Sequence, residues 1–430
     1  MGTLLLAVQL VDRCRRRDLD QRIRAETAAG GRLSRRRQAA LALTIVGLVC
    51  VAGSPRRDRA PITSRGVEVT YASRAALARV LRVRPARLLR VVAPLHVAEV
   101  RPAGATAAYV RAVRRAPGIV GAHATVLRSA SRRKSADSAS REWQYHAVGI
   151  DRVPRDVLAA AARITIAVVD TGADLASPAL AGKVRAAYDV RTGRRRARDT
   201  NGHGTFVASL AGGVNRQEDG FGGFGGAARL LVVKVSNSTS FSDVAVAAGI
   251  VYAVRHGARI VNLSVAGRAR SVVEKAALRY AARRGVLVVA AAGNDALAGD
   301  PPEYPAALLQ PVGSNGIGGP GISVGASDCN GARAGFSEYG SFVSLAAPGE
   351  SVFGASRASY GYASGTSFAA PEVAGVAALV WAANPRLSFR QVATILKRTA
   401  SGRGAWSPEL GFGVIDAAAA VQRAAASAAG

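Results

Sequence analysis

Between residues 164 and 325, short apolar runs alternate with stretches of helical periodicity. The apolar runs cover residues 164–169, 230–235, 259–263, 286–291 and 322–325. The helical stretches between them include residues 243–256 and 271–284. Continuous Val, Ile and Leu strands that alternate with helices indicate a parallel sheet covered on both faces. We therefore predict an α/β fold with a doubly wound, mostly parallel sheet for residues 143–430.

A second, smaller pattern precedes this one. Residues 66–127 read as strand, helix, strand, helix and strand, with boundaries at 67–71, 73–83, 88–100, 105–116 and 119–127. The segment predicts a compact α+β domain of the ferredoxin-like type. It carries no paired carboxylates, ligand cluster or glycine loop, so we do not expect an active site there. Residues 128–142 are small, polar and basic, which predicts an exposed, cleavable linker and a domain boundary.

The first 53 residues have the layout of an export signal. Three arginines at 35–37 precede an uncharged apolar run at 38–53. A helix needs about 20 apolar residues to span a bilayer, and this run is shorter. Cleavage near Ala52 or Gly53 is therefore favoured over a permanent anchor, with a membrane tether through residues 38–53 as the alternative. Residues 1–33 are either a cytoplasmic tail or a sign that translation starts later.

Composition sets limits on partners. The chain has 430 residues, of which 49 % are hydrophobic and 20 % charged, enough for two folded units and a targeting segment. The formal net charge is +30. The arginines spread through both predicted domains, without a stripe of interleaved aromatic residues. This distribution favours a compositional bias over a specific nucleic-acid partner. We expect an exported protein that is a monomer.

Candidate acid–base groups occur at the ends of the predicted elements. Asp170 directly follows the first apolar run, at the carboxyl end of a buried strand, where active sites in such sheets gather. His203 lies in Asn-Gly-His-Gly-Thr, where the glycines permit a close backbone approach. His256 sits at the end of a helical stretch before Gly257 and is interpreted as structural. Taken alone, Asp170 could equally cap a turn.

A candidate nucleophile and a candidate amide donor complete this set. Ser367 lies in a run of small residues ahead of Pro371. Proline is tolerated only in the first turn of a helix, so we predict that Pro371 lies in a first turn and that Ser367 lies near the helix N-terminus, with free N–H groups around it. Its alternative role is that of an N-cap, which does not explain the small residues around it. Asn294 ends the run at 286–294 and is either a turn former or a donor to an oxyanion, beside the N–H of Ser367.

Five segments together resemble a known family. AVVDTG, NGHGTFVAS, IVNLSVAG, VVAAAGN and SGTSFAAP resemble the signature blocks of the subtilisin-like serine proteases, the subtilase family or peptidase family S8. They occur in the same order and at compatible spacing. The resemblance covers residues 143–425 and implies a subtilisin-like fold. It also implies a serine endopeptidase that works through an Asp-His-Ser triad and an acyl-enzyme intermediate, without a required cofactor.

The resemblance assigns roles residue by residue. It implies that Asp170 orients His203, that His203 takes the proton of Ser367, and that Asn294 binds the oxyanion. It also implies a groove for an extended peptide or protein substrate, lined by Ser264, Val265 and Ala266. Departures from the family pattern are Phe206 and Glu372, where histidine is common, and Phe368, where methionine is usual.

Two further features follow from the resemblance. Many relatives bind structural calcium, and the loop at 214–220 occupies the place of one such site. Arg216 in that loop is an awkward neighbour for a divalent cation, so no metal site is assigned. The small domain resembles the family's inhibitory propeptide, which implies an intramolecular inhibitor and a self-processing zymogen. An unrelated accessory domain is the alternative.

Other functions and preferences stay open as hypotheses. The chain could be a catalytically silent relative that only binds peptides, or a basic protein that binds nucleic acid. If it is active, we predict cleavage after apolar residues, because the segments 264–267 and 290–294 carry no acidic side chain and Asp295 is the nearby exception. We also predict self-cleavage between Leu127 and Trp143.

Overall fold

The computed structural model describes residues 66–130, 133–134, 143–214, 222–357 and 359–429. Its largest sheet has seven strands in the order β14-β13-β12-β11-β7-β9-β8, and all neighbouring strands run parallel. The strands are β7 (Thr165–Asp170), β8 (Val184–Asp189), β9 (Arg229–Lys234), β11 (Ile260–Leu263), β12 (Leu287–Ala291), β13 (Gly321–Ser327) and β14 (Leu345–Pro348). The predicted parallel α/β sheet is therefore confirmed.

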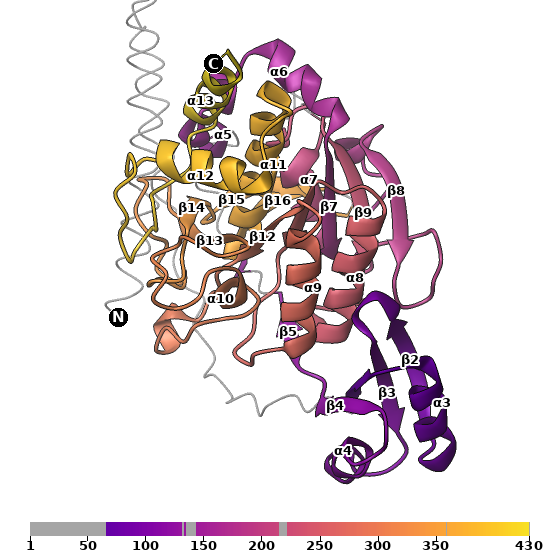
Figure 1. Cartoon of the computed structure of the whole chain (residues 1–430). Helices are drawn as coiled ribbons and strands as arrows, with labels where there is room; N and C mark the ends of the chain where they lie inside the picture. Colours follow the sequence, from indigo (N-terminus) through magenta and orange to yellow (C-terminus); the bar gives the residue numbers. More distant parts are fainter. Residues whose placement is uncertain (1–65, 131–132, 135–142, 215–221, 358, 430) are drawn as a thin grey trace, which may run out of the picture. The chain divides into compact units, whose positions relative to one another are not determined.

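Helices cover both faces of this sheet (Figure 1). Alternate side chains of a strand point to opposite faces, and β7 displays this directly. Ile166 and Val168 join the hydrophobic cluster that contains the residues of α7 (His203–Gly212) and α11 (Thr366–Ala383). Ala167 and Val169 join the cluster that contains α8 (Asp243–Arg255) and α9 (Val272–Ala282). The sheet is thus doubly wound, as predicted.

The predicted elements of the large domain, residues 143–430, agree with the structure to within two residues at each end. The sequence pattern missed several short or half-exposed elements, because these lack a continuous apolar run. The missed strands include β8, β14, β10 (Ser240–Ser242), β15 (Val352–Ala355) and β16 (Tyr360–Ser364). The remaining helices are α5 (Trp143–Val148), α6 (Arg155–Ala160), α10 (Ala306–Leu309), α12 (Phe389–Thr399) and α13 (Ala417–Ala429).

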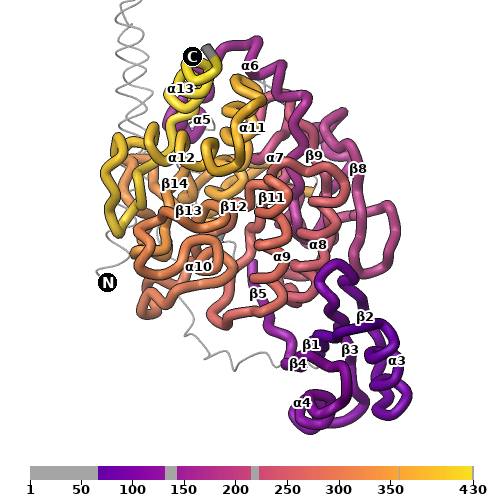
Figure 2. Tube along the Cα trace, in the orientation of Figure 1, coloured from indigo at the N-terminus to yellow at the C-terminus, as the bar shows by residue number. Residues whose placement is uncertain are grey.

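Residues 66–124 form a separate small sheet (Figure 2). Its elements are β1 (Val67–Tyr71), α3 (Arg74–Val83), β2 (Ala86–Val92), β3 (Val97–Pro102), α4 (Thr106–Arg114) and β4 (Ile119–Ala124). The strands pair antiparallel in the order β2-β3-β1-β4, which is the βαββαβ arrangement of ferredoxin-like domains. The single strand predicted over 88–100 was wrong. A 3-10 turn at Ala93–Leu95, with Pro94 in its first turn and His96 at φ 54°, divides it into β2 and β3.

One face of the small sheet packs in the small domain's own core, and the other faces the large domain. Val67, Val69 and Tyr71 pack in the small domain's own core. On the opposite face Glu68 and Glu99 are also buried, because the large domain covers them. The hydroxyl of Ser242, which caps α8, donates to Glu99 at 3.0 Å, while Val92 and Val97 join the cluster of α8 and α9. The small and large domains therefore belong to one compact unit.

The segment predicted as an exposed linker pairs with the large domain. Strand β5 (Leu127–Ser129) runs antiparallel to β10, and β6 (Arg133–Lys134) runs antiparallel to β16. Arg128 and Ala130 are buried, with exposed fractions of 1 % and 6 %, so the prediction of exposure was wrong at these positions. Polar composition alone could not reveal that two strand edges of the large domain accept this segment.

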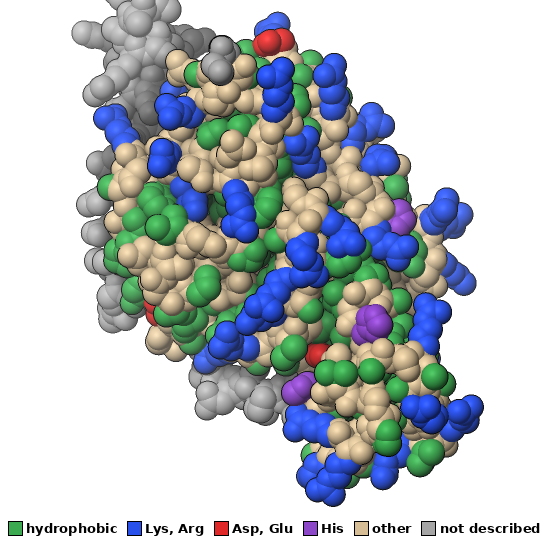
Figure 3. All heavy atoms as spheres, viewed as in Figure 1, with side chains coloured by type: hydrophobic (Ala, Val, Ile, Leu, Met, Phe, Trp, Pro, Cys, Tyr) green, Lys and Arg blue, Asp and Glu red, His purple; other side chains and the backbone are tan. Residues whose placement is uncertain are grey.

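Lys and Arg side chains scatter over the visible faces of both domains (Figure 3). Among the described residues, α11 is the one helix long and apolar enough to cross a membrane, and it is buried in the core. The apolar run at 38–53 and the rest of the predicted leader at 1–53 lie outside the described residues.

Candidate active site

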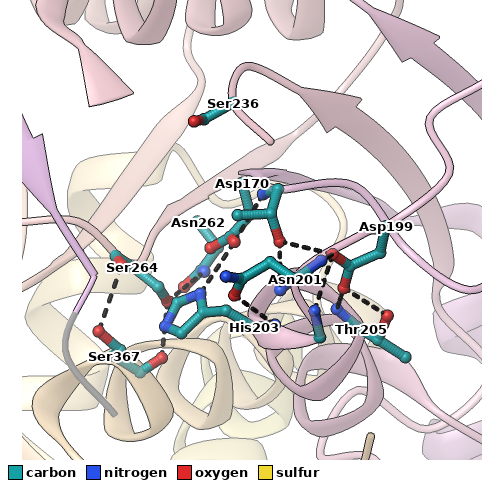
Figure 4. A network of polar contacts seen from close by, with 12 residues as sticks. Asp170, Asp199, Asn201, His203, Thr205, Ser236, Asn262, Ser264 and Ser367 are labelled. Carbon is teal, nitrogen blue, oxygen red and sulfur yellow. Dashed lines mark hydrogen bonds and ion pairs between the residues drawn. The ribbon is translucent and has the colours of Figure 1, made fainter. Parts of the chain in front are cut away.

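Asp170 and His203 meet at the carboxyl edge of the large sheet (Figure 4). Asp170 is the last residue of β7 and His203 the first of α7, and both are 1 % exposed. The Oδ1 atom of Asp170 lies 2.8 Å from Nδ1 of His203. This contact favours the tautomer with the proton on Nδ1. Nε2 of His203 is buried and has no hydrogen-bond partner among the described residues, which leaves it as the basic nitrogen.

Asp199, which the sequence analysis did not identify, connects the loops that carry this pair. Its carboxylate accepts hydrogen bonds from the N–H groups of Asn201 and Gly202, each at 2.9 Å. It also accepts from the Thr205 N–H at 2.9 Å and the Thr205 hydroxyl at 2.6 Å. The Thr171 hydroxyl donates to it at 3.0 Å. Burial raises the pKa of Asp199, but these hydrogen bonds outweigh it and hold the pKa below its usual value.

Ser367 lies at the start of α11, one residue after its first residue Thr366. Its hydroxyl donates to the carbonyl of Ser264 at 3.2 Å, and the described structure contains no hydrogen bond between Ser367 and His203. The prediction that Pro371 must lie in a first turn was wrong, because it falls in the second turn. Proline cannot donate to the Ser367 carbonyl four residues earlier. The Ser264 hydroxyl donates to that carbonyl instead, at 2.6 Å.

Asn294 is oriented by Thr366, which the sequence analysis also missed. The amide oxygen of Asn294 accepts the Thr366 N–H at 2.8 Å and its hydroxyl at 3.1 Å. The Thr366 hydroxyl also accepts the N–H of Gly293 at 3.2 Å. Because the oxygen end of the amide is occupied, the Nδ2 end is left to donate elsewhere. The structure thus brings Asn294 beside the helix N-terminus that carries Ser367.

The three predicted groove residues differ in what they contact. The carbonyl of Ser264 accepts the Ser367 hydroxyl, as described above. The side chain of Val265 packs in the cluster of α8 and α9. Ala266 exchanges two backbone hydrogen bonds with Ser129, at 2.8 and 3.0 Å, and the Ala130 N–H donates to the carbonyl of Thr239 at 2.8 Å. An extended segment of the chain itself therefore occupies this position.

Buried carboxyl groups lie directly behind Asn294. The backbone N–H of Asn294 donates to Glu303, and burial, with the nearby Asp295, raises the pKa of Glu303 to about 7. Burial, with Asp300, raises the pKa of Glu338 to about 9. Asp295, the acidic residue noted from the sequence, lies 3.1 Å from Arg268. Glu303 was missed because it lies outside the two segments, 264–267 and 290–294, from which the apolar preference was predicted. The expected apolar preference stays a prediction.

The positions that depart from the family pattern are packed in the core. Phe206 and Phe368 lie with ring centroids 4.7 Å apart, and Phe368 lies 5.6 Å from the ring of His203. Glu372 is fully buried, and neither carboxyl oxygen has a hydrogen-bond partner in the described part of the chain. Burial raises its pKa well above the usual value.

No cluster of three or more His, Cys, Asp or Glu residues suited to a metal ion occurs among the described residues. The loop at 214–220 lies outside them, apart from Val214. The expectation that calcium is possible there but not assigned therefore stays a prediction.

Comparisons with known proteins agree with the geometry. Residues 161–413 match the model of the Subtilase family. Thermitase from Thermoactinomyces vulgaris is 39 % identical over 247 residues, which are 56 % of this chain and 83 % of that protein. Subtilisin Savinase from Lederbergia lenta is 36 % identical over 261 residues, which are 60 % of this chain and 91 % of that protein.

Solved structures extend the likeness to the fold. Fervidolysin from Fervidobacterium pennivorans, described as a keratinolytic enzyme related to subtilisin, superposes with a TM-score of 0.71 at 24 % identity. The match covers 86 % of this chain and 62 % of that chain. At this identity the match shows a likeness of fold.

Proposed function

The chain belongs to the subtilase family of serine proteases, and we propose that Asp170, His203 and Ser367 are its catalytic triad. The observation that carries the proposal is the 2.8 Å contact between Asp170 Oδ1 and His203 Nδ1. It leaves the basic Nε2 for the proton of a nucleophile. Ser367 supplies that nucleophile at a helix N-terminus on the same edge of the sheet.

The first half of the reaction forms an acyl-enzyme. Ser367 Oγ releases the Ser264 carbonyl and attacks the peptide carbonyl carbon, while its proton moves to His203 Nε2. Asp170 stabilises the imidazolium that results. Asn294 Nδ2 and the backbone N–H of Ser367 donate to the oxyanion, because both carry free donors in a preorganised site. The C–N bond then breaks, and His203 returns its proton to the leaving amine.

The second half restores the enzyme. Water loses a proton to His203 and attacks the acyl carbon, and the bond to Ser367 Oγ breaks as that oxygen regains the proton. All groups in this cycle come from the chain, so no cofactor is required. The groove that we propose for the substrate is lined by Ser264, Val265 and Ala266, of which Ala266 already pairs with an extended strand.

We also propose that the protein is a self-processing zymogen. In this organisation residues 1–53 are the leader, 66–127 the inhibitory propeptide, 128–142 the cleaved segment and 143–430 the catalytic domain. The pairing of β5 and β6 supports it, because these strands precede and follow the same short stretch of chain. Ser129 pairs with Ala266, two residues after Ser264. Arg133 pairs with Ser364, three residues before Ser367. The cut bond is then one of the three between Ala130 and Arg133.

The remaining proposals concern the context of the enzyme. We propose export, with the signal at 38–53 cleaved rather than kept as an anchor, and a monomer that acts on peptides or proteins. Structural calcium is not required for the proposed cycle. No nucleic-acid partner is proposed, since the basic side chains are scattered over the visible surface rather than gathered in one stripe (Figure 3).

The test is the intact mass of two forms expressed in a host without other exported proteases. The wild-type chain should lose the small domain by a cut between Ala130 and Arg133, and a fluorophosphonate probe should label Ser367. Ser367→Ala should keep residues 66–127 and remain unlabelled, while removal of the export signal should be the same in both. If Ser367→Ala is cut at the same bond, another enzyme does the processing and the zymogen proposal fails.

A further inference from the structure

The side chain of Arg128 is fully buried against Glu274 of the large domain. Its guanidinium faces the carboxylate of Glu274, with Nη2 to Oε2 at 2.5 Å and Nε to Oε1 at 3.1 Å. Both side chains are 0 % exposed. A forked guanidinium–carboxylate contact of this kind is among the strongest and most directional polar interactions in proteins. The pocket therefore matches the shape and charge of an arginine.

The acidic groups of this pocket come from two helix N-termini. Glu274 lies in the first turn of α9, where its N–H donates to the N-cap Ser271 at 3.1 Å. Asp243 is the first residue of α8, is 1 % exposed, and accepts the N–H of Val126 at 3.2 Å. Helix N-termini favour negative charge. Burial, then Glu274, raises the pKa of Asp243 to about 7, while Arg128 lowers it.

Gly267 forms a wall of the pocket. A Cβ at this position would lie 2.9 Å from the carbonyl oxygen of Leu127 and 3.3 Å from Nη1 of Arg128. The space that admits the arginine thus depends on the missing side chain at Gly267. No left-handed backbone conformation applies there, so alanine would narrow the pocket without backbone strain.

The position of the pocket relative to Ser367 follows from strand pairing. Arg128 lies opposite Phe241 in the β5–β10 pair, and its neighbour Ser129 pairs with Ala266. If the chain is cut between Ala130 and Arg133, Arg128 is the third, fourth or fifth residue before the cut bond. Its side chain is then a specificity contact at a distance from the reacting carbonyl.

We propose that Glu274 is a specificity-determining residue and that this protease selects extended peptides with arginine at the position of Arg128, third to fifth before the cut bond. The inference rests on the proposed protease function and names its substrate class. When the propeptide leaves, Glu274 loses its counterion, and an entering arginine restores it. Arginine is preferred over lysine because only the planar fork matches the carboxylate with two donors. An apolar side chain would leave the carboxylate without a partner.

The test uses matched peptides and active-site titration. The full chain is expressed, allowed to process itself and separated from the released small domain, and active enzyme is counted with a fluorophosphonate. Three quenched fluorescent peptides carry the sequence of residues 126–134 with Arg, Lys or Leu at the position of Arg128. The enzyme forms are wild type, Glu274→Gln, and Glu409→Gln as a matched control. Glu409 pairs with Arg333 on the surface of the large domain.

Wild type and Glu409→Gln should cleave the Arg peptide at least about 30-fold faster in kcat/KM than the Leu peptide, with the Lys peptide between them. In Glu274→Gln the Arg-to-Leu ratio of kcat/KM should disappear, because cleavage of the Arg peptide slows while cleavage of the Leu peptide stays the same. Gly267→Ala gives a second measure. Its Cβ would crowd the carbonyl at the position of Leu127 in every peptide but a guanidinium only in the Arg peptide, so all three peptides should slow and the Arg peptide should slow most. Should Glu274→Gln fail to fold, the Arg-to-Leu ratio of kcat/KM in Gly267→Ala decides, and a ratio equal to that of wild type would overturn the inference.

Two outcomes would overturn the inference. If wild type cleaves the Arg and Leu peptides within twofold of each other, the buried pair only anchors the propeptide. If Glu274→Gln lowers the rates for both peptides equally, its effect is structural. A protein that neither takes the probe nor cleaves any peptide overturns the proposed function together with this inference, whereas a labelled enzyme without preference overturns the inference alone.

Discussion

Replacing Glu68 with glutamine in the uncut Ser367→Ala precursor should remove a loss of stability at high pH. This loss arises where the small domain contacts the large one. Glu68 is 2 % exposed, and its Oε1 has no hydrogen-bond partner in the described residues. Thr70 donates a hydrogen bond to its carboxyl. The titratable groups that face it are Asp243 and Glu274 of the large domain and Glu99 and His123 of the neighbouring strands. Burial, followed by Asp243, raises its pKa from 4.5 to about 8.

The sign and size of the effect follow from this shift. A carboxyl group whose pKa is raised in the folded precursor binds its proton more tightly there than in water. Its contribution to stability is complete below pH 4.5 and is lost as the pH rises through about 8. Each pKa unit corresponds to about 1.4 kcal/mol, so the loss approaches about 5 kcal/mol. Glu68 reaches water whether the small domain unfolds or is released, so both routes give the same sign.

The assay is the Tm of each precursor at pH 5 and pH 9. Glu68→Gln should gain roughly 5 °C relative to its parent between these values, while other buried carboxyls affect both proteins alike. Glu99→Gln is the matched control on the neighbouring strand. Glu99 lies 2.5 Å from Arg90 and accepts from Ser242, so this variant should lower the Tm at both pH values. A constant Tm difference between Glu68→Gln and its parent would refute the reasoning.

Four other changes test the site and the core. Asn294→Leu should lower kcat by about 10² to 10³ with KM nearly unchanged, a magnitude that comes from a subtilisin and not from this structure; normal turnover would exclude Asn294 as the donor. In Gly204→Ala the new Cβ would overlap the carbonyl oxygen of Gly172, which should cost at least about 2 kcal/mol of stability in thermal unfolding. Gly335→Ala, with open space around it, should change stability by less than about 0.5 kcal/mol. Glu372→Leu should raise the free energy of unfolding by about 1–3 kcal/mol, and with it the Tm, because a buried carboxyl without a partner is removed. A lower Tm would indicate that the carboxyl has a partner.

Local patterns were sufficient where one residue's neighbours in sequence define its environment. The apolar runs placed β7, β9, β11, β12 and β13 to within two residues, because a buried strand needs an uninterrupted apolar segment. The same runs placed Asp170 and Asn294 at strand ends, and glycines and small residues marked His203 and Ser367 at helix starts. These four positions could be chosen from sequence because each lies at the end of a regular element, and that end is marked by glycines, by small residues or by the last residue of an apolar run.

Contacts between distant segments could not be read in this way. Asp199 accepts hydrogen bonds from a loop for which the sequence pattern predicted no element. Thr366 orients Asn294, although the two are separated by 72 positions in the sequence. Arg128 and Glu274 are separated by 146 positions, and in the sequence one looks like a linker residue and the other like an ordinary helical glutamate. Periodicity reports only which face of its own element a residue occupies. The packing of the elements in three dimensions decides which groups lie together in a buried volume. It therefore also decides which charged groups pair with one another.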